Sequence, residues 1–314
     1  GRTRAGGNES DELAKAQIRH HESVDMAKLR SLVRSGTLSR DHRQRCQRYL
    51  RSPSDAVVEY THAIGRGDGR LYSTGNAIQG LPAAVRAVVC DGYDDLDLSV
   101  SHMAMLANLS RREAPPPPPA GANRMTRFRL GRDKRKRASV SPRLRELVSE
   151  KDRIRSDLAQ QYGCSKADIK KLLLRKLYGA VNDDAWFRAA GLAPRLHVPW
   201  VREYEDEVHA LAKRLVTDDD REFARLRKEV KGGDTSERAV LFSALSELCA
   251  RVEQQVIGAL SDFLSQRGYQ RLKMVNMHDG IMVLREDVGG KAADVQLLDD
   301  AQAYIKEVLN VSIG

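Results

Sequence analysis

The spacing of apolar residues divides the start of the chain into helical and extended segments. Apolar positions recur with a loose 3.6-residue period over residues 9–52, which predicts two helices separated at 35–39. Residues 56–62 have β character. A glycine-rich turn at 65–69 leads into a further extended piece at 70–73, so a β-hairpin is predicted there.

The rest of the chain is expected to be mostly helical, with a few short strands. A strand over residues 96–100 leads into a helix that ends near Arg112. Further helices are predicted at 142–161, 165–179, 202–230, 236–267 and 293–308. Apolar runs at 272–277 and 281–284 flank a polar turn, which predicts a hairpin with Asp279 at its tip. This order of elements is typical of an α+β fold in which one antiparallel sheet is backed by helices.

A proline-rich and basic segment interrupts this pattern at residues 113–141. Five consecutive prolines, Pro115–Pro119, require an extended backbone, so a partly disordered insert is predicted. Residues 124–137 contain eight basic side chains and a single Asp133. Such a run binds phosphates, stays solvated or serves as a nuclear-localisation signal, and the sequence leaves these three interpretations open. The first interpretation assigns nucleic-acid contacts to Arg127, Arg129, Lys134 and Arg135.

Composition limits the class of protein. The chain has 314 residues, 41% of them hydrophobic, enough for one sizeable core or two small ones. Its formal net charge of +10 favours a polyanionic partner. Four widely separated cysteines indicate neither a zinc knuckle nor a dense disulfide framework. No apolar run approaches the roughly 18 residues that a membrane span needs, so a soluble, intracellular protein without a membrane partner is expected.

Two aspartates occupy settings that suit metal-ion chemistry on phosphates. Asp97 ends a predicted strand and Asp279 lies at a predicted hairpin tip, so the two could meet on one sheet surface. Two carboxylates there would bridge two Mg²⁺ ions about 3.5–4 Å apart, which activate a 3′-hydroxyl and stabilise a pyrophosphate leaving group. Taken singly, each aspartate is better explained as a turn or capping residue, and His278 as a half-buried imidazole.

The predicted helix at 165–179 carries a stripe of two cations, an apolar residue and an aromatic. Lys166, Lys170, Leu174 and Tyr178 are each four residues apart, so they project within about 120° of one face. Lysines facing the aspartates would neutralise a triphosphate, and one could protonate the departing pyrophosphate. A solvated helix with ordinary lysines explains the same stripe when it is taken alone.

Four short motifs, in one order, resemble those of the family A DNA polymerases and their single-subunit RNA polymerase relatives. Gly69-Arg70-Leu71-Tyr72-Ser73, followed by Asn76-Ala77-Ile78-Gln79-Gly80-Leu81-Pro82, is similar to the family's TGRLSS…PNLQNIP. Asp97-Leu98-Ser99 resembles motif A, DYS. Lys166-x₃-Lys170-x₃-Leu174-x₃-Tyr178-Gly179 resembles motif B, R-x₃-K-x₃-(F/Y)-x₃-YG, and His278-Asp279 resembles motif C, HDE. Each motif is weak alone, and their common order carries the resemblance.

The resemblance implies a right-hand polymerase palm, helical fingers and a role for each matching residue. Asp97, Asp279 and the Leu98 carbonyl would bind two Mg²⁺ ions, for which Mn²⁺ is an alternative. Lys170 would hold the incoming triphosphate and act as general acid. Lys166 would stand where the family has a phosphate-binding arginine. The remaining expected contacts are Leu174, Tyr178 and His102 for the nucleotide, and Arg70, Gln79 and His278 for the primer–template.

The implied domain order is a shortened thumb-like region, a palm in two parts and fingers between them. The expected boundaries are thumb 1–56, palm 57–112 and 236–314, insert 113–141 and fingers 142–235. Residues before 56 leave no room for a 3′–5′ exonuclease domain, so the chain as given is expected not to proofread. The expected partners are primer–template nucleic acid and nucleoside triphosphates, bound by a monomer. Nucleus, mitochondrion and a virus- or plasmid-encoded origin all stay open.

Departures from the family pattern leave the nucleotide preference open. His102 lies five residues after Asp97, where DNA polymerases of the family carry a glutamate that excludes the ribose 2′-hydroxyl. Leu174 and Gly280 also vary, in the direction of the RNA polymerases, whereas Gln79-Gly80-Leu81-Pro82 is closer to the DNA-polymerase form. A DNA polymerase is therefore the main prediction. A single-subunit RNA polymerase or primase-like enzyme, and a polymerase-derived binding protein without catalysis, are the alternatives.

Overall fold

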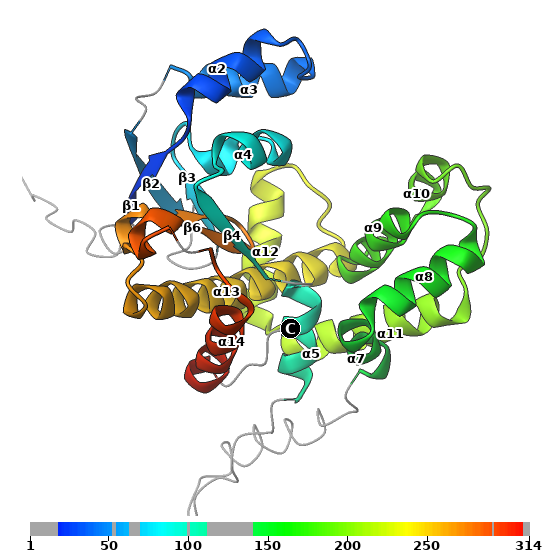
Figure 1. Cartoon of the computed structure of the whole chain (residues 1–314). Helices are drawn as coiled ribbons and strands as arrows, with labels where there is room; N and C mark the ends of the chain where they lie inside the picture. The colour runs from blue at the N-terminus through cyan, green and yellow to red at the C-terminus, as the bar shows by residue number, and fades with distance from the viewer. Residues whose placement is uncertain are drawn as a thin grey trace, which may run out of the picture. The chain divides into compact units, whose positions relative to one another are not determined.

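The chain has an α+β fold, as predicted, and divides into two compact units (Figure 1). The computed structural model describes residues 18–51, 55–62, 70–98, 101–111, 141–290 and 292–309. Unit 1 comprises Gly1–Ser99 and Ala250–Ile313, and unit 2 comprises Val100–Cys249. Within the described ranges, no helix is both long and apolar enough to cross a membrane.

The described strands of unit 1 form two antiparallel sheets. The first has the order β1 (Ile18–Ser23), β2 (Asp55–His62), β3 (Leu71–Ser73), and the second β4 (Tyr93–Asp97), β6 (Gly280–Leu284), β5 (Val275–Asn276). The β2–β3 and β5–β6 pairings confirm both predicted hairpins. The strand predicted at 96–100 lies earlier, but Asp97 still ends it.

The prediction of a single sheet is wrong. The short edge strands β3 and β5 are not paired with each other. Instead, the Gln79 side chain lies between them and donates from Nε2 to the Leu71 and Asn276 carbonyls, at 3.1 and 2.9 Å. Its Oε1 accepts from the Ser73 N–H at 3.1 Å. The Gln79 amide therefore forms hydrogen bonds with backbone groups that would pair β3 with β5 in a continuous sheet.

Strand β1 contradicts the helix that the periodicity predicts for this segment. Its inward side chains are polar: His20 and Glu22 are buried. The Glu22 carboxylate accepts from the Tyr60 hydroxyl, and His20 Nε2 lies 3.1 Å from Asn276 Nδ2. A search for apolar periodicity misses such a strand, because its buried positions carry no apolar side chain. Since β1 pairs with β2, it shares a sheet with the segment predicted as palm. Residues 9–17 lie outside the described residues.

Helices α2 (Met26–Arg34), α3 (Arg40–Tyr49) and α4 (Ala83–Val89) share a hydrophobic core with the second sheet of unit 1. The later part of α13 (Glu237–Gln266) contacts α14 (Val295–Leu309) through the rings of Phe263 and Tyr304. Helices α2 and α3 confirm the two predicted before residue 52, and the side chains of Asp25 and Ser39 cap them. The core joins Leu29 and Val85 to Tyr93 and Met282, so it fixes β4 and β6 in place.

The described part of unit 2 is helical. Its helices are α5 (Ser101–Arg111), α7 (Pro142–Ser149), α8 (Lys151–Tyr162), α9 (Lys166–Leu177), α10 (Asp184–Ala189), α11 (Pro199–Leu215), α12 (Asp218–Val230) and the start of α13. The predicted helix at 142–161 is two helices, because the backbone at Glu150 leaves helical geometry (φ −131°, ψ 35°). The one predicted at 202–230 also divides, at Thr217, whose side chain caps α12.

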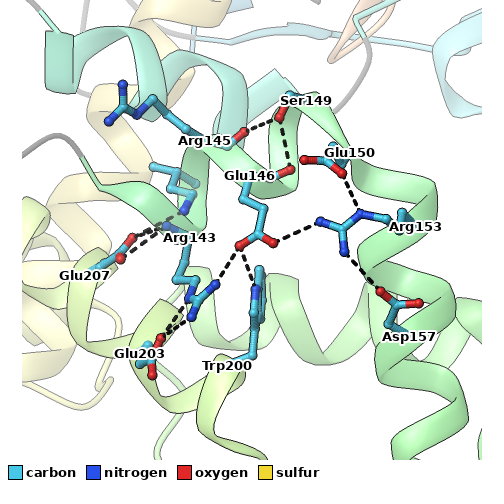
Figure 2. A network of polar contacts seen from close by, with 11 residues as sticks. Arg143, Arg145, Glu146, Ser149, Glu150, Arg153, Asp157, Trp200, Glu203 and Glu207 are labelled. Carbon is cyan, nitrogen blue, oxygen red and sulfur yellow. Dashed lines mark hydrogen bonds and ion pairs between the residues drawn. The ribbon is translucent and has the colours of Figure 1, made fainter.

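Charged side chains fix α7 against α8 and α11 (Figure 2). The Glu146 carboxylate accepts from Arg143, Arg153 and the Trp200 indole, at 2.8, 3.0 and 3.0 Å. Glu207 of α11 accepts from the backbone N–H of Arg143 at 2.9 Å. That N–H belongs to the first turn of α7, which has no intrahelical acceptor, so Glu207 caps the helix from a neighbouring element.

Candidate active site

The structure brings two of the predicted metal ligands together at one end of the second sheet. Asp97, the last residue of β4, pairs in register with Gly280, the first residue of β6. The following residue, Leu98, donates its N–H to the Asp279 carbonyl at 2.8 Å. Asp97 at the end of β4 and Asp279 directly before β6 thus lie at the same end of two paired strands (Figure 1).

Gly280 has no room for a side chain. A Cβ at this position would lie 2.5 Å from the Leu96 carbonyl oxygen and 2.7 Å from Asp97 Oδ1. Both distances are far inside van der Waals contact, and one of the two atoms belongs to the backbone. The glutamate of the family's motif C therefore cannot be placed here unless β4 moves, which is a physical reason for the glycine.

A third carboxylate, Asp95, belongs to the same group and was missed by the sequence prediction. It lies two residues before Asp97, so both side chains project from one face of β4. Burial raises the pKa of Asp95, and the charge of Asp279 adds to this. Burial likewise raises the pKa of Asp97, followed by the charges of Asp95 and Asp279. The i, i+2 spacing of Asp95 and Asp97 was the signal, but the strand predicted at 96–100 begins one residue too late to include Asp95.

The three carboxylates are not neutralised by ion pairs with described residues. Arg86 of α4 opposes the pKa shifts of Asp95 and Asp97 through its charge, while its Nη1 donates to the Leu81 carbonyl at 2.8 Å. Among the residues with coordinates described above, no group of three His, Cys, Asp or Glu side chains is arranged to hold a metal ion. Mg²⁺ is often bound by one or two carboxylates together with substrate phosphates, and the donor set of Asp97 and Asp279 fits that mode.

Arg70, predicted to contact the primer–template, is held by a buried glutamate. Its Nε donates to Glu253 Oε2 at 2.5 Å, and Glu253 is 0% exposed. The sequence prediction missed Glu253. The sequence did contain an indication of its burial: Glu253 lies four residues from both Cys249 and Ile257, which places it on the apolar face of α13. The ion pair orients Arg70 from within unit 1.

His278, directly before Asp279, and Gln79, which contacts Asn276 of β5, differ in whether their side chains already have hydrogen-bond partners. His278 is half-buried, and burial followed by the charge of Arg70 lowers its pKa. Its Nδ1 is buried without a hydrogen-bond partner among the described residues. The Gln79 amide, in contrast, joins the two sheets as described. A contact between Gln79 and nucleic acid, as predicted, would add to this structural role.

The motif B stripe lies on helix α9 of unit 2, and the predicted helix is confirmed. Ser165 caps it by accepting from the Asp168 N–H, as its position indicated. Lys166 and Lys170 are exposed, and neither forms an ion pair with a described residue. Leu174 is half-buried and Tyr178 is 41% exposed. The stripe is therefore an accessible face of the helix.

His102 and Tyr178, both predicted to contact the nucleotide, are hydrogen-bonded to each other. His102 Nδ1 lies 2.6 Å from the Tyr178 hydroxyl, with the rings edge to face. Gly179 follows with φ +78°, and a Cβ there would meet the Phe242 ring at 2.2 Å. Both facts require glycine at this position. The structure therefore joins His102 of α5 to Tyr178 at the end of α9.

Tyr178 also lines an open cavity of about 560 Å³ in unit 2. Its lining includes Leu174, Tyr178, Phe242, Arg175, Lys228 and Arg238. The sequence prediction missed the three basic residues, which come from α9, α12 and α13. Arg238 also donates to the Gly179 carbonyl at 3.0 Å and pairs with Glu205 at 2.8 Å. The cavity combines apolar walls with cationic groups, a combination that suits a nucleotide.

Several predicted contacts lie outside the described residues. They are Arg127, Arg129, Lys134 and Arg135 of the basic insert, together with Gly69 and Ser99 of the motifs. Comparison of the sequence with protein-family models and with curated proteins finds no match. The polymerase resemblance therefore rests on the four motifs and stays a prediction.

Proposed function

We propose that this protein is a nucleotidyltransferase that extends a primer 3′-hydroxyl on a template, as the family A polymerases do. The observation that carries the proposal is the pairing of β4 with β6, which sets Asp97 beside Asp279 without a neutralising partner among the described residues. In this proposal the sheet with these aspartates is the palm, and the helices of unit 2 are the fingers.

Asp97, Asp279 and the Leu98 carbonyl would hold two Mg²⁺ ions, or Mn²⁺. When bound, such ions lower the pKa of the attacking hydroxyl and stabilise charge on the leaving pyrophosphate. Lys170, an exposed lysine without an ion pair in the described chain, would bind the triphosphate and donate a proton to the pyrophosphate. Lys166, one turn earlier, would add a second positive charge for the phosphates.

The pair His102–Tyr178 would contact the sugar of the incoming nucleotide. Its hydrogen bond fixes the Tyr178 hydroxyl, and a fixed group at the sugar discriminates by excluding or accepting the 2′-hydroxyl. Because His102 replaces a glutamate, we propose DNA synthesis with weaker rejection of ribonucleotides. An RNA polymerase or primase-like activity is the alternative outcome of the same test.

The test is extension of a labelled DNA primer on a template by the purified chain with Mg²⁺. We expect extension with deoxynucleotides, its loss in Asp97→Asn and Asp279→Asn, and its retention in Asp299→Asn. Asp299 is an exposed acid of α14 and serves as the matched control. Equal extension with ribonucleotides would assign the enzyme to the RNA-polymerase alternative. Tight binding of the duplex without extension by any nucleotide would leave only the non-catalytic binding protein.

A further inference from the structure

Tyr72 carries an exposed aromatic ring next to the candidate active site. It lies in the middle of β3, between the buried Leu71 and Ser73, and pairs in register with Thr61. Its relative exposure is 42%, whereas Tyr49, Tyr60 and Tyr93 of the same unit are buried. The motif that this segment resembles has serine at this position, so the resemblance does not account for the ring.

The ring of His278 connects Tyr72 to the aspartates. The centroids of the two rings are 5.2 Å apart, with an interplanar angle of 54°. His278 directly precedes Asp279 in the chain, at the turn between β5 and β6. A ring from β3 of the first sheet thus meets a ring from the turn before β6 of the second sheet, directly before Asp279, and the ring of Tyr72 is 42% exposed.

We infer that Tyr72 and His278 form a stacking platform for the terminal nucleoside of a nucleic-acid strand. The inference rests on the proposed function, since a 3′-hydroxyl that reacts beside Asp97 must be held in a fixed position. Stacking on an aromatic side chain holds a base of any identity, because every base has a π-face. An enzyme that copies a template needs this tolerance at the primer end.

The test uses a primer–template duplex whose 3′-terminal primer base is 2-aminopurine, in metal-free buffer so that no extension occurs. Stacking quenches or shifts the fluorescence of this base. We expect the wild-type protein to change the signal and Tyr72→Ser to lose most of that change. Binding of the duplex, followed by anisotropy, should weaken about 5- to 150-fold in Tyr72→Ser, the range for loss of one stacked base.

Two variants keep the ring and should behave like the wild type: Tyr72→Phe, and Tyr72→Trp, whose indole fluorescence gives a second signal from the same position. Val57→Ala, at an exposed residue of β2, is the surface control. An unchanged signal and affinity in Tyr72→Ser would overturn the platform even if primers are extended. Loss of the signal in Tyr72→Ser, in a protein that extends no primer, would retain the platform and overturn the proposed catalysis.

Discussion

The aspartates at the end of β4 in unit 1 and Asp183 in unit 2 have opposite surroundings. Asp183 of unit 2 is buried, and its carboxylate contacts Lys176 Nζ at 2.5 Å and His197 Nε2 at 2.8 Å. Burial, the largest influence, would raise its pKa, but the hydrogen bonds from Lys176 and His197 outweigh burial and lower the pKa. Asp95 and Asp97 of unit 1 have raised pKa values and no such partners in the described chain.

The difference is the one expected between a structural charge and, under the proposed function, a charge that binds a metal ion. A buried carboxylate with matched cations joins elements of the fold, as Asp183 joins α9 to the segment around His197. Carboxylates that repel one another and remain accessible destabilise the fold until a cation binds. The comparison therefore predicts that substitutions in the two places have different effects on stability and on activity.

The largest effect is expected for Lys176→Met. Lys176 is buried and contacts both Asp183 and Glu205, the latter at 2.9 Å. Its loss removes the buried cation that the two carboxylates share and leaves Asp183 to Arg175 and His197, and Glu205 to Arg238. The free energy of unfolding should therefore fall by about 3 kcal/mol, the lower end of the range for a broken buried ion pair. Urea unfolding followed by tryptophan fluorescence measures this, because both tryptophans, Trp186 and Trp200, belong to unit 2.

Lys170→Met is the matched control on the same helix. Lys170 is exposed, so its substitution should change the free energy of unfolding by no more than about 0.5 kcal/mol. Under the proposed function it should nevertheless abolish most of the primer extension. Equal destabilisation by the two substitutions would remove the distinction between structural and functional charges on α9.

Local signals in the sequence predict much of this arrangement. The helix that carries Lys170 has an N-cap serine, an acid in its first turn and a terminal glycine, and all three belong to the helix itself. The hairpin at Asp279 is similarly local. Interactions between distant residues are different: Arg70 and Glu253 are 183 positions apart, and no local pattern links them.

Buried polar side chains explain why the sequence predicted neither strand β1 nor the division into two sheets. Strand β1 has His20 and Glu22 on its inner side, and the two sheets are joined by the Gln79 amide rather than by apolar packing. Their polar side chains gave no sign of burial in the sequence, and only the fold shows which partners they find inside the protein: Tyr60 for Glu22, Asn276 for His20 Nε2, and backbone groups for Gln79. The sequence likewise does not distinguish Asp97 from Asp183, because it does not show which aspartate is buried with cationic partners.

The second largest effect on stability is expected from a divalent cation bound to unit 1. At a Mg²⁺ or Mn²⁺ concentration 100 times its dissociation constant, the wild-type protein should gain about 2.7 kcal/mol. Slower amide hydrogen exchange in β4 and β6 would report the gain in that sheet. The double variant Asp97→Asn, Asp279→Asn should show no such protection. Protection of the same size in the double variant would place the cation elsewhere.

The third prediction is that Asp95 and Asp97 on one side, and Asp183 on the other, make the free energy of unfolding depend on pH in opposite directions. The raised pKa values of Asp95 and Asp97 mean that their contribution is fully present below about pH 4 and is lost as pH rises through the folded-state values. The lowered pKa of Asp183 means that its contribution is present above about pH 4 and is lost as pH falls further. In metal-free buffer, Asp97→Asn should flatten the first trend and Asp183→Asn the second, in urea unfolding from pH 3 to 7. Parallel changes in the two variants would contradict the comparison.

The smallest effect is expected for Asp97→Asn at neutral pH without metal. The substitution removes one of three repelling charges and breaks no hydrogen bond or ion pair with a described residue. Because the side chain is exposed, solvent screens the repulsion, and stability should rise by no more than about 0.5 kcal/mol. Hydrogen exchange of β4 and β6 measures this. A loss above about 1 kcal/mol would show that the carboxylate is a structural group like that of Asp183, since surface substitutions seldom have so large an effect.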